Sequence, residues 1–302
     1  MIERPLADLN RQLTQALQEH GEREAAAIAD LYLDEQFGAS RTDILLNKSV
    51  TLSAEGEQTF SDHLRRLSEG EPVQYVLGRA NFLGRTFHVS PAVLIPRPET
   101  EGILPLAANL LGDTPAPHIL DAGTGSGCIA ISLALQHTKG SVTAWDISDE
   151  AIAVASQNAQ ALSAKVRFLH RDILAEAETP TDSAASLDLL VSNPPYIRER
   201  EKAEMETHVL DHEPHLALFV PDYDPLRFYR ALGQLGLHLL KPGGHLLVET
   251  HSDYATHTAQ LFEVLGYSAV RVHHDCFDLP RFVEARRDQL PIFLWETSYF
   301  QT

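Results

Sequence analysis

Short apolar runs alternate with helix-like segments from residue 118 onward, and this alternation constrains the fold more than any other feature of the chain. Helical patterns occupy residues 129–137, 150–162 and 226–240, between successive apolar runs. Such strand–helix alternation predicts a parallel, doubly wound α/β sheet with helices on both faces. The strands are expected at residues 118–120, 142–145, 166–169, 187–191 and 245–248, with two more at 269–272 and 282–285.

The N-terminal part of the chain has a different pattern, because apolar residues recur there at helical spacing. A first stripe ends near Gly21, a second segment covers residues 26–37 and closes at Gly38, and a third stripe ends near Gly70. These segments predict a small helical bundle. The first stripe consists of Leu6, Leu9, Leu13 and Leu17, and the third of Phe60, Leu64 and Leu67.

A linker of another character follows the bundle. Residues 81–98 hold short extended runs, including 93–95, broken by Gly84, Pro91 and Pro96, which predicts a β-hairpin linker. At 302 residues the chain exceeds the usual size of one domain. We therefore expect three parts: a helical domain (1–78), the hairpin linker (79–98) and the α/β domain (99–302).

Composition excludes several classes of function. The net charge is -18, from 24 basic and 42 acidic residues, which disfavours binding to a phosphate backbone and favours a protein or small-molecule substrate. No apolar run is long enough to span a bilayer, and the N-terminus lacks a secretion signal. Cys128 and Cys276 form no CxxC pattern, and the histidines lack ligand spacing, so we expect a cytoplasmic protein without a metal site.

A glycine-rich turn follows the first strand of the α/β domain. Gly123, Gly125 and Gly127 alternate with Thr124 and Ser126 before a helix begins. Glycines at alternate positions let the backbone turn tightly and approach a ligand at the positive end of the helix. The turn matches neither the dinucleotide fingerprint nor the P-loop. We expect these five residues to bind a cofactor.

The next two strands end on carboxylates. Asp146 lies about 20 residues beyond the glycine turn, where an acid can accept both hydroxyls of a ribose; Ser148 or Asp149 suits the alternative role of helix N-cap better. Asp172 ends the third strand and could accept from the amine of an adenine, with Ile173 against the ring. Together with the glycine turn they predict a cofactor that carries adenosine.

The fourth strand delivers a stiff turn, Asn193-Pro194-Pro195-Tyr196, to the same edge of the sheet. Two prolines cannot continue a strand, and the residue before a proline is held extended. The turn therefore presents an amide side chain, backbone carbonyls and an aromatic ring. This combination suits a planar group that bears an NH2.

These motifs resemble the class I S-adenosylmethionine-dependent methyltransferases, and the Asn-Pro-Pro-Tyr turn resembles the branch that methylates NH2 groups on planar systems. Together with residues 71–75 and 95–101, they resemble the HemK/PrmC family up to about Arg286, with Ala122 and Ser126 as variants within the glycine turn. The tail beyond Arg287 is not part of that pattern, and two roles stay open for it: an added edge strand, or docking elsewhere on the protein.

The resemblance implies a Rossmann-like methyltransferase domain preceded by a helical substrate-recognition domain. It implies transfer of a methyl group from S-adenosylmethionine to the N5 amide of a glutamine in class-1 peptide chain release factors, which act in translation termination. Asn193, Pro194, Pro195 and Tyr196 would hold the amide, with Asn193 and Pro194 accepting its N–H groups, Tyr196 packing on its plane and Asn193 also meeting the cofactor. No direct contact with nucleic acid or membrane is expected, and the protein is expected to be a monomer.

Three alternatives stay open. A sibling enzyme methylates a glutamine of a ribosomal protein with the same turn, and residues 98–101 favour the release-factor branch over it. An adenine-N6 methyltransferase of nucleic acids also uses this turn, but the charge of -18 weighs against it. An idle adenosylmethionine-binding scaffold is the third. The charged segment at 198–215 is expected to be a mobile loop that closes over substrate, or else an ordinary solvated loop.

Overall fold

The computed structural model describes residues 1–18, 21–182, 184–205 and 207–288, and these form two compact units. The helical unit comprises Met1–Pro96 and Arg200–Ala217. The sheet unit comprises Arg97–Glu199 and Leu218–Thr302. The expected edge strand in the tail lies outside the described residues. No helix in the described ranges is long and apolar enough to cross a membrane.

The helical unit is built around the predicted leucine stripe, which is fully buried. Helix α2 ends at Gly38, whose left-handed φ of 63° closes the helix as the sequence predicts. Tyr32 and Phe60 pack edge to face in this core at a centroid distance of 6.0 Å. The helices are α1 (Leu6–Ala16), α2 (Glu22–Phe37), α3 (Arg41–Leu45), α4 (Ala54–Ser68) and α5 (Val73–Leu77).

Two short strands in this unit were not predicted. Strands β1 (Ile2–Pro5) and β2 (Ser49–Leu52) pair in antiparallel register. Each has only four residues, and their pairing joins segments far apart in the sequence, so no local alternation indicated them. The expectation of a purely helical block was therefore wrong at these two places.

The predicted hairpin is confirmed as β3 (Arg79–Phe82) and β4 (Arg85–His88). Its turn residues, Leu83 and Gly84, both have positive φ, as a tight two-residue hairpin turn requires. Phe82 and Phe87 pack edge to face on one side of the ribbon. The apolar run at 93–95, in contrast, is not a strand.

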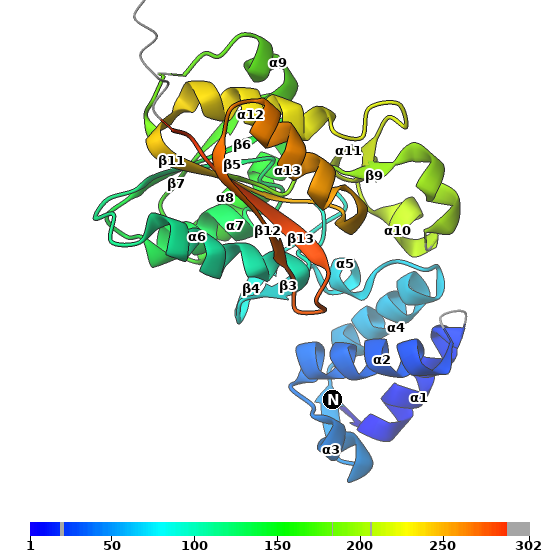
Figure 1. The fold of residues 1–302 in the computed structure, drawn as a ribbon. Helices are drawn as coiled ribbons and strands as arrows, with labels where there is room; N and C mark the ends of the chain where they lie inside the picture. The colour runs from blue at the N-terminus through cyan, green and yellow to red at the C-terminus, as the bar shows by residue number, and fades with distance from the viewer. Residues whose placement is uncertain (19–20, 183, 206, 289–302) are drawn as a thin grey trace, which may run out of the picture. The chain divides into compact units, whose positions relative to one another are not determined.

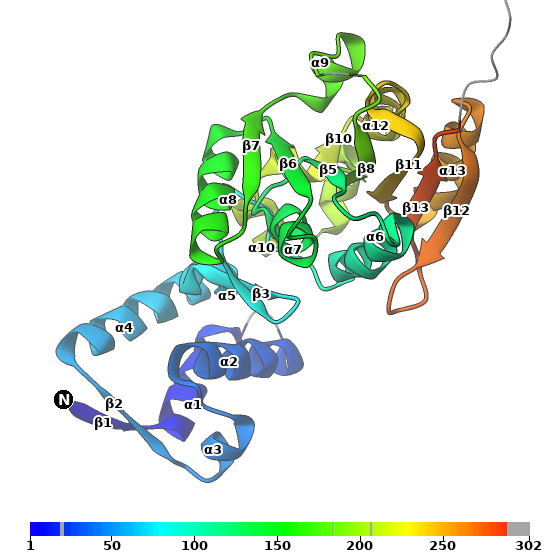
Figure 2. The same cartoon turned by 90° about the vertical axis from the view of Figure 1, so that its left-hand side faces the viewer.

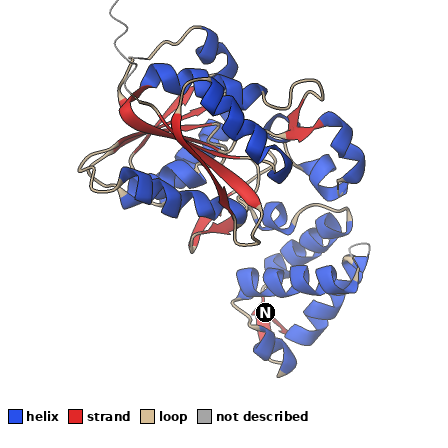
Figure 3. Cartoon of the chain, in the orientation of Figure 1, coloured by secondary structure: helices blue, strands red, loops and turns tan. Residues whose placement is uncertain are grey.

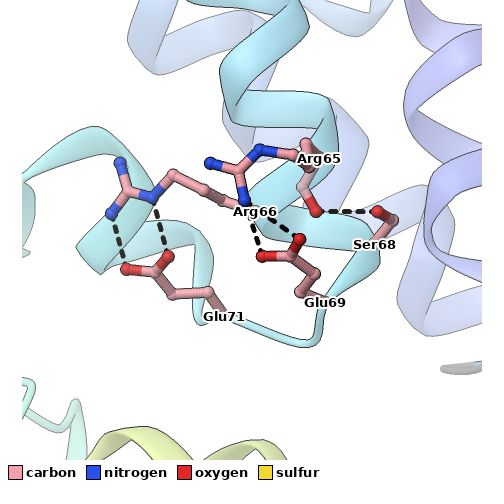
Figure 4. A network of polar contacts seen from close by, with 5 residues as sticks. All are labelled: Arg65, Arg66, Ser68, Glu69 and Glu71. Carbon is pink, nitrogen blue, oxygen red and sulfur yellow. Dashed lines mark hydrogen bonds and ion pairs between the residues drawn. The ribbon is translucent and has the colours of Figure 1, made fainter.

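Arg66 braces the turn between α4 and α5 (Figure 4). Its guanidinium donates to both carboxylate oxygens of Glu71, at 2.7 and 2.5 Å, and to the carbonyls of Tyr75 and Val76. The Tyr75 hydroxyl in turn donates to the Val93 carbonyl at 2.6 Å. These contacts explain structurally why an acidic residue and a tyrosine stand in the segment 71–75.

The segment at 198–215 is not the irregular loop expected from its charge. It holds the 3-10 helix η3 (Glu199–Glu204) and the helices α10 (Thr207–His212) and α11 (His215–Leu218). Glu213 is buried, and its carboxylate accepts from the Ile95 backbone N–H at 3.3 Å. That the segment 198–215 closes over the substrate stays a prediction.

The sheet unit contains a seven-stranded sheet in the order β12-β13-β11-β8-β5-β6-β7 (Figures 1 and 3). All seven predicted strands are present. The five neighbouring strands β11, β8, β5, β6 and β7 run parallel to one another. Their bounds are β5 (His118–Ala122), β6 (Ser141–Asp146), β7 (Val166–His170), β8 (Leu187–Ser192), β11 (Leu240–Glu249), β12 (Ser268–His274) and β13 (Pro280–Arg286).

The sheet is mixed and not wholly parallel, which corrects the sequence-based expectation. Strand β13 runs antiparallel to both of its neighbours, β11 and β12. The connection between β12 and β13 consists of only the five residues 275–279. A turn this short can join two antiparallel strands, whereas parallel strands need a longer crossover connection. A short parallel pair, β9 (Ile197–Arg198) with β10 (Phe219–Val220), lies outside this sheet.

Helices cover both faces of the sheet, as Figure 1 and the turned view in Figure 2 show. One face packs on α12 (Arg227–Leu239), α13 (Ala255–Val264) and α9 (Ile173–Glu178), around Trp145, Leu190 and Val248. The other face carries α6 (Ile103–Leu111), α7 (Cys128–Gln136) and α8 (Asp149–Ala161). The 3-10 helices are η2 (Glu99–Gly102), before α6, and η4 (Ser252–Tyr254), before α13.

Candidate active site

The strand order reverses between β5 and β8, because the chain runs from β5 outward to β7 and then returns to β8. In open α/β sheets ligands bind at such a reversal, beyond the carboxyl ends of the strands. The Ser192 hydroxyl donates to the Ala122 carbonyl at 2.5 Å and fastens these two ends together. The next residues are Asn193 and Gly123, so the structure brings the two predicted motifs to one place.

The glycine turn has the left-handed backbone that only glycine adopts easily. Gly123, Gly125 and Gly127 have φ values of 77°, 53° and 82°. A Cβ on Gly127 would lie 2.9 Å from Ile131 Cδ1 and 3.1 Å from Ala155 Cβ, whereas a Cβ on Gly125 would meet nothing within 4 Å. The turn is therefore packed beneath Gly127 and open above Gly125, where a ligand can approach the backbone.

Thr124 and Ser126 support the turn from within. The Thr124 hydroxyl donates to Asp121 Oδ2 at 2.7 Å, and the Ser126 carbonyl accepts from Asn158 Nδ2 at 2.9 Å. Both residues are buried. Burial raises the pKa of Asp121 to about 7, against the hydrogen bonds from Thr124 and the Ala130 backbone. A ligand on this turn would meet backbone atoms of Thr124 rather than its hydroxyl.

Asp146 is tied to the glycine turn. Its Oδ2 accepts from the Gly125 backbone N–H at 2.9 Å and its Oδ1 from the Ser148 backbone N–H at 3.0 Å. Burial raises the pKa of this carboxyl. The prediction that Ser148 caps the following helix is confirmed, because its hydroxyl accepts from Ala151 N–H. Asp146 therefore lies at the carboxyl end of β6, beside the glycine turn, and Ser148 takes the role of N-cap of α8 in its place.

Asp172 has a local role that the sequence did not indicate. Its carboxylate accepts from the Leu174 backbone N–H at 2.9 Å and so forms the N-cap of α9. Ile173 is buried, and its Cδ1 lies 3.7 Å from the position that a Cβ on Gly123 would take. The apolar side chain therefore borders the glycine turn, and its contact with an adenine stays a prediction.

The Asn193 side chain is held from one side. Its Nδ2 donates to the Thr100 hydroxyl oxygen at 3.2 Å, and no donor to its Oδ1 is found in the part of the chain that the structure describes. Pro194 is buried, which anchors the turn. The Tyr196 ring lies 6.1 Å from the ring of His251, and burial raises the pKa of its hydroxyl.

Two residues of the site were missed by sequence reasoning. Glu249 ends β11 and is 1% exposed, and Thr100 in η2 is 2% exposed. Burial raises the pKa of Glu249 to about 7, opposed by the neighbouring Thr100 and Tyr196 hydroxyls and by the charge of Arg281. The available signal was a single acidic residue directly after the apolar run 246–248, at the same sheet edge. Among the described residues no cluster suited to a metal ion is found.

Comparison with known proteins gives a consistent assignment. Residues 8–78 match the family described as PrmC N-terminal domain, and residues 104–215 match methyltransferase small domain. A release factor glutamine methyltransferase of Bacteroides thetaiotaomicron is 44% identical over 91% of this chain and 98% of its own. A protein of the same name from Flavobacterium psychrophilum is 36% identical over 87% of this chain and 92% of its own.

Solved structures support the fold alone. A 16S rRNA methyltransferase of T. thermophilus (RsmC), solved with AdoMet and guanosine, matches 69% of this chain and 49% of its own with a TM-score of 0.50 and 19% identity. The identity of the sequence relatives, across nearly the whole of both chains, is far higher. The chain therefore belongs to the family of release factor glutamine methyltransferases.

Proposed function

We propose that this protein transfers a methyl group from S-adenosylmethionine to the N5 side-chain amide of a glutamine in a class-1 peptide chain release factor. The observation that carries the proposal is the 44% identity, over almost all of both chains, to a protein named for this activity. The site agrees with it, because a glycine turn and an amide-bearing turn leave neighbouring strands at the reversal of strand order.

The residues present fit the cofactor. The open space above Gly125 would admit the methionine part close to the backbone, and the Asp146 carboxylate would accept from the ribose hydroxyls. Ile173 would pack on the adenine, with the second oxygen of Asp172 available to its amine. S-adenosylmethionine supplies an electrophilic methyl group on a sulfonium.

The Asn193 turn would orient the nucleophile. An amide nitrogen is a poor nucleophile because its lone pair is delocalised into the carbonyl. Asn193 Oδ1 and the Pro194 carbonyl would accept its two N–H groups, which directs the lone pair and favours the positive charge that develops on nitrogen. Tyr196 would pack on the amide plane, and Pro195 would keep the turn rigid. The proton would leave after transfer.

The finer assignments follow from the substrate. We place the protein in the cytoplasm, where release factors act, as a monomer without direct contact to nucleic acid; the charge of -18 supports the last point. Residues 1–78 are proposed to recognise the substrate and 99–302 to carry the chemistry, with 79–98 as linker. A glutamine of a ribosomal protein is the second candidate, since the same turn would serve it.

The test compares substrates directly. The protein is incubated with labelled S-adenosylmethionine and, separately, a purified class-1 release factor, the ribosomal protein and duplex DNA, and the modified residue is mapped by mass spectrometry. We expect one methyl group on a glutamine side chain of the release factor. Label that enters only the ribosomal protein or only DNA would contradict the proposal.

A further inference from the structure

The inference concerns what holds the Tyr196 ring in place, and it rests on the proposed function. In that function Tyr196 packs on the plane of the substrate amide, so the tilt of its ring helps to decide where the amide nitrogen lies. Tyr196 follows β8 and His251 follows β11, and these strands are parallel neighbours with Val248 opposite Ser192. The two side chains therefore leave the same edge of the sheet. Their ring centroids lie 6.1 Å apart, with the ring planes tilted by 59°.

The backbone of His251 is tied down on both sides. The preceding residue, Thr250, donates its backbone N–H to the Arg281 carbonyl on β13 at 2.8 Å. The His251 carbonyl in turn accepts from the backbone N–H of Tyr254, in η4, at 2.9 Å. His251 is therefore attached both to the sheet and to the short helix that follows it, and its side chain starts from a defined place.

The imidazole of His251 has a defined direction as well. Its Nδ1 accepts from the Asp253 backbone N–H at 3.2 Å, so the ring is the N-cap of η4. The Asp253 carboxylate is no substitute partner, because its Oδ2 lies 3.8 Å from Nδ1, beyond hydrogen-bond distance. The imidazole also pairs with the Tyr254 ring at a centroid distance of 6.0 Å, and the Arg198 guanidinium lies over Tyr254 at 5.4 Å. A hydrogen bond and a second ring thus hold the imidazole that pairs with Tyr196.

We propose that His251 is a positioning residue for the methyl transfer: its imidazole packs against the Tyr196 ring and fixes the plane on which the substrate amide lies, without touching the reacting atoms. Tyr196 also packs against the apolar core of the sheet unit, so its ring is supported by the core and by His251 together. A tilted ring pair is favourable, because the positive edge of one ring meets the negative face of the other. Loss of the imidazole would let Tyr196 change its tilt, and a displacement of about 1 Å can slow a reaction by about 100-fold.

Two substitutions separate the ring of His251 from its role as a cap. His251→Asn keeps an acceptor for the Asp253 N–H but has no ring, whereas His251→Phe keeps a ring but has no acceptor. If the ring positions Tyr196, single-turnover methylation of a purified class-1 release factor should slow by about tenfold in His251→Asn and stay within about threefold of the wild type in His251→Phe. Urea unfolding should show the opposite order for stability, with His251→Phe the less stable variant, because it lacks the cap.

A double-mutant cycle tests whether His251 acts through Tyr196. Tyr196→Leu removes the ring that His251 is proposed to hold. If Tyr196 carries the effect, adding His251→Asn to Tyr196→Leu should slow methylation no further. The affinity for S-adenosylmethionine should be unchanged in all of these variants, because the glycine turn and Asp146 are unaltered.

His257→Ala is the matched control. The His257 ring is exposed on α13 and pairs with Tyr254 at a centroid distance of 6.2 Å, but no pairing with Tyr196 is found among the described residues. Its removal takes a histidine ring from beside Tyr254 and leaves Tyr196 as it is. This variant should methylate at the wild-type rate.

The outcomes separate this inference from the proposed function. Slower methylation in His251→Asn, a rate kept in His251→Phe and no further loss in the double variant support it. A wild-type rate in His251→Asn, an equal loss in His251→Phe, or a full additional loss in the double variant overturns it, while methylation of the release factor by the wild type still stands. If His251→Phe folds poorly, the cycle with His251→Asn, which keeps the cap, decides alone. A wild-type protein that methylates no glutamine overturns the proposed function and this inference with it.

Discussion

The Ser192 hydroxyl donates a hydrogen bond of 2.5 Å to the Ala122 carbonyl, and both groups are completely buried. Ser192 is the last residue of β8 and Ala122 the last of β5. The bond therefore joins the two strands at the point from which the glycine turn and the Asn193 turn begin. We therefore expect loss of this one contact to disturb both turns.

Ser192→Ala should destabilise the protein by about 1–3 kcal/mol, the usual cost of leaving a buried carbonyl without its partner. Urea unfolding can be followed by the fluorescence of the buried Trp145 in a Trp295→Phe background, because the chain has two tryptophans. Ser132→Ala is the control, since Ser132 is equally buried and its hydroxyl has no partner among the described residues. Equal losses in both variants would refute this role of Ser192.

Gly127→Ala should weaken cofactor binding and lower stability by about 1–3 kcal/mol. A Cβ there is strained by the φ of 82° and also collides with Ile131 and Ala155. Gly243→Ala separates the two causes, because Gly243 has a φ of 86° and open space around it. Calorimetric titration with S-adenosylmethionine should show weaker binding for Gly127→Ala only. Normal affinity in that variant would show that the packing beneath the turn is dispensable.

Asp121 should make stability depend on pH. Its folded pKa of about 7 lies above the ordinary value of an aspartate, so the folded state keeps its proton longer than the unfolded state. The free energy of unfolding should therefore fall by at most about 4 kcal/mol as the pH rises from about 4 to about 7. At higher pH it should no longer change. The Asp121→Asn variant should lose this slope in urea unfolding across the same range. If the pH dependence of stability persists in this variant, other buried carboxyl groups must cause it.

Local sequence patterns were sufficient for the seven strands of the main sheet, for the helices α7, α8 and α12, for the glycine turn and for the Ser148 cap. Each of these depends on neighbours in the chain: apolar periodicity, backbone freedom or a side chain two or three residues from its partner. The candidate site residues Asn193, Gly123 and Asp146 were predicted for the same reason, since each directly follows or ends a recognisable strand.

The features that were missed depend on which segments meet in space. The pairing of β1 with β2, the place of β13 between β11 and β12, and the contact of Thr100 with Asn193 all join distant parts of the chain. A lone Glu249 after an apolar run has the same local pattern whether it faces solvent or a buried site. The order of the strands in the sheet decides whether Glu249 faces solvent or a buried site, and local periodicity does not predict that order.

Asn193→Ala should reduce the methylation rate by about 100-fold, the scale on which a single oriented polar group contributes to a transition state. Affinity for S-adenosylmethionine should stay close to that of the wild type, because the glycine turn and Asp146 are unaltered. Asn109→Ala, at an exposed asparagine on α6, is the control and should behave as wild type. Undiminished methylation by Asn193→Ala in a steady-state assay would remove Asn193 from the mechanism.

Arg66→Lys should destabilise the helical unit by about 1–2 kcal/mol, because a lysine cannot reproduce two parallel bonds to one carboxylate together with bonds to two carbonyls. Arg65 beside it offers a matched comparison (Figure 4): it also pairs with a glutamate, Glu69, but both side chains are largely exposed. Arg65→Lys should therefore change stability by less than about 0.5 kcal/mol. Hydrogen exchange of the α5 peptides should become faster in Arg66→Lys and stay unchanged in Arg65→Lys. Equal protection in both variants would mean that the fork of Arg66 and Glu71 does not brace the turn, and that the acidic residue at the start of the segment 71–75 needs another explanation.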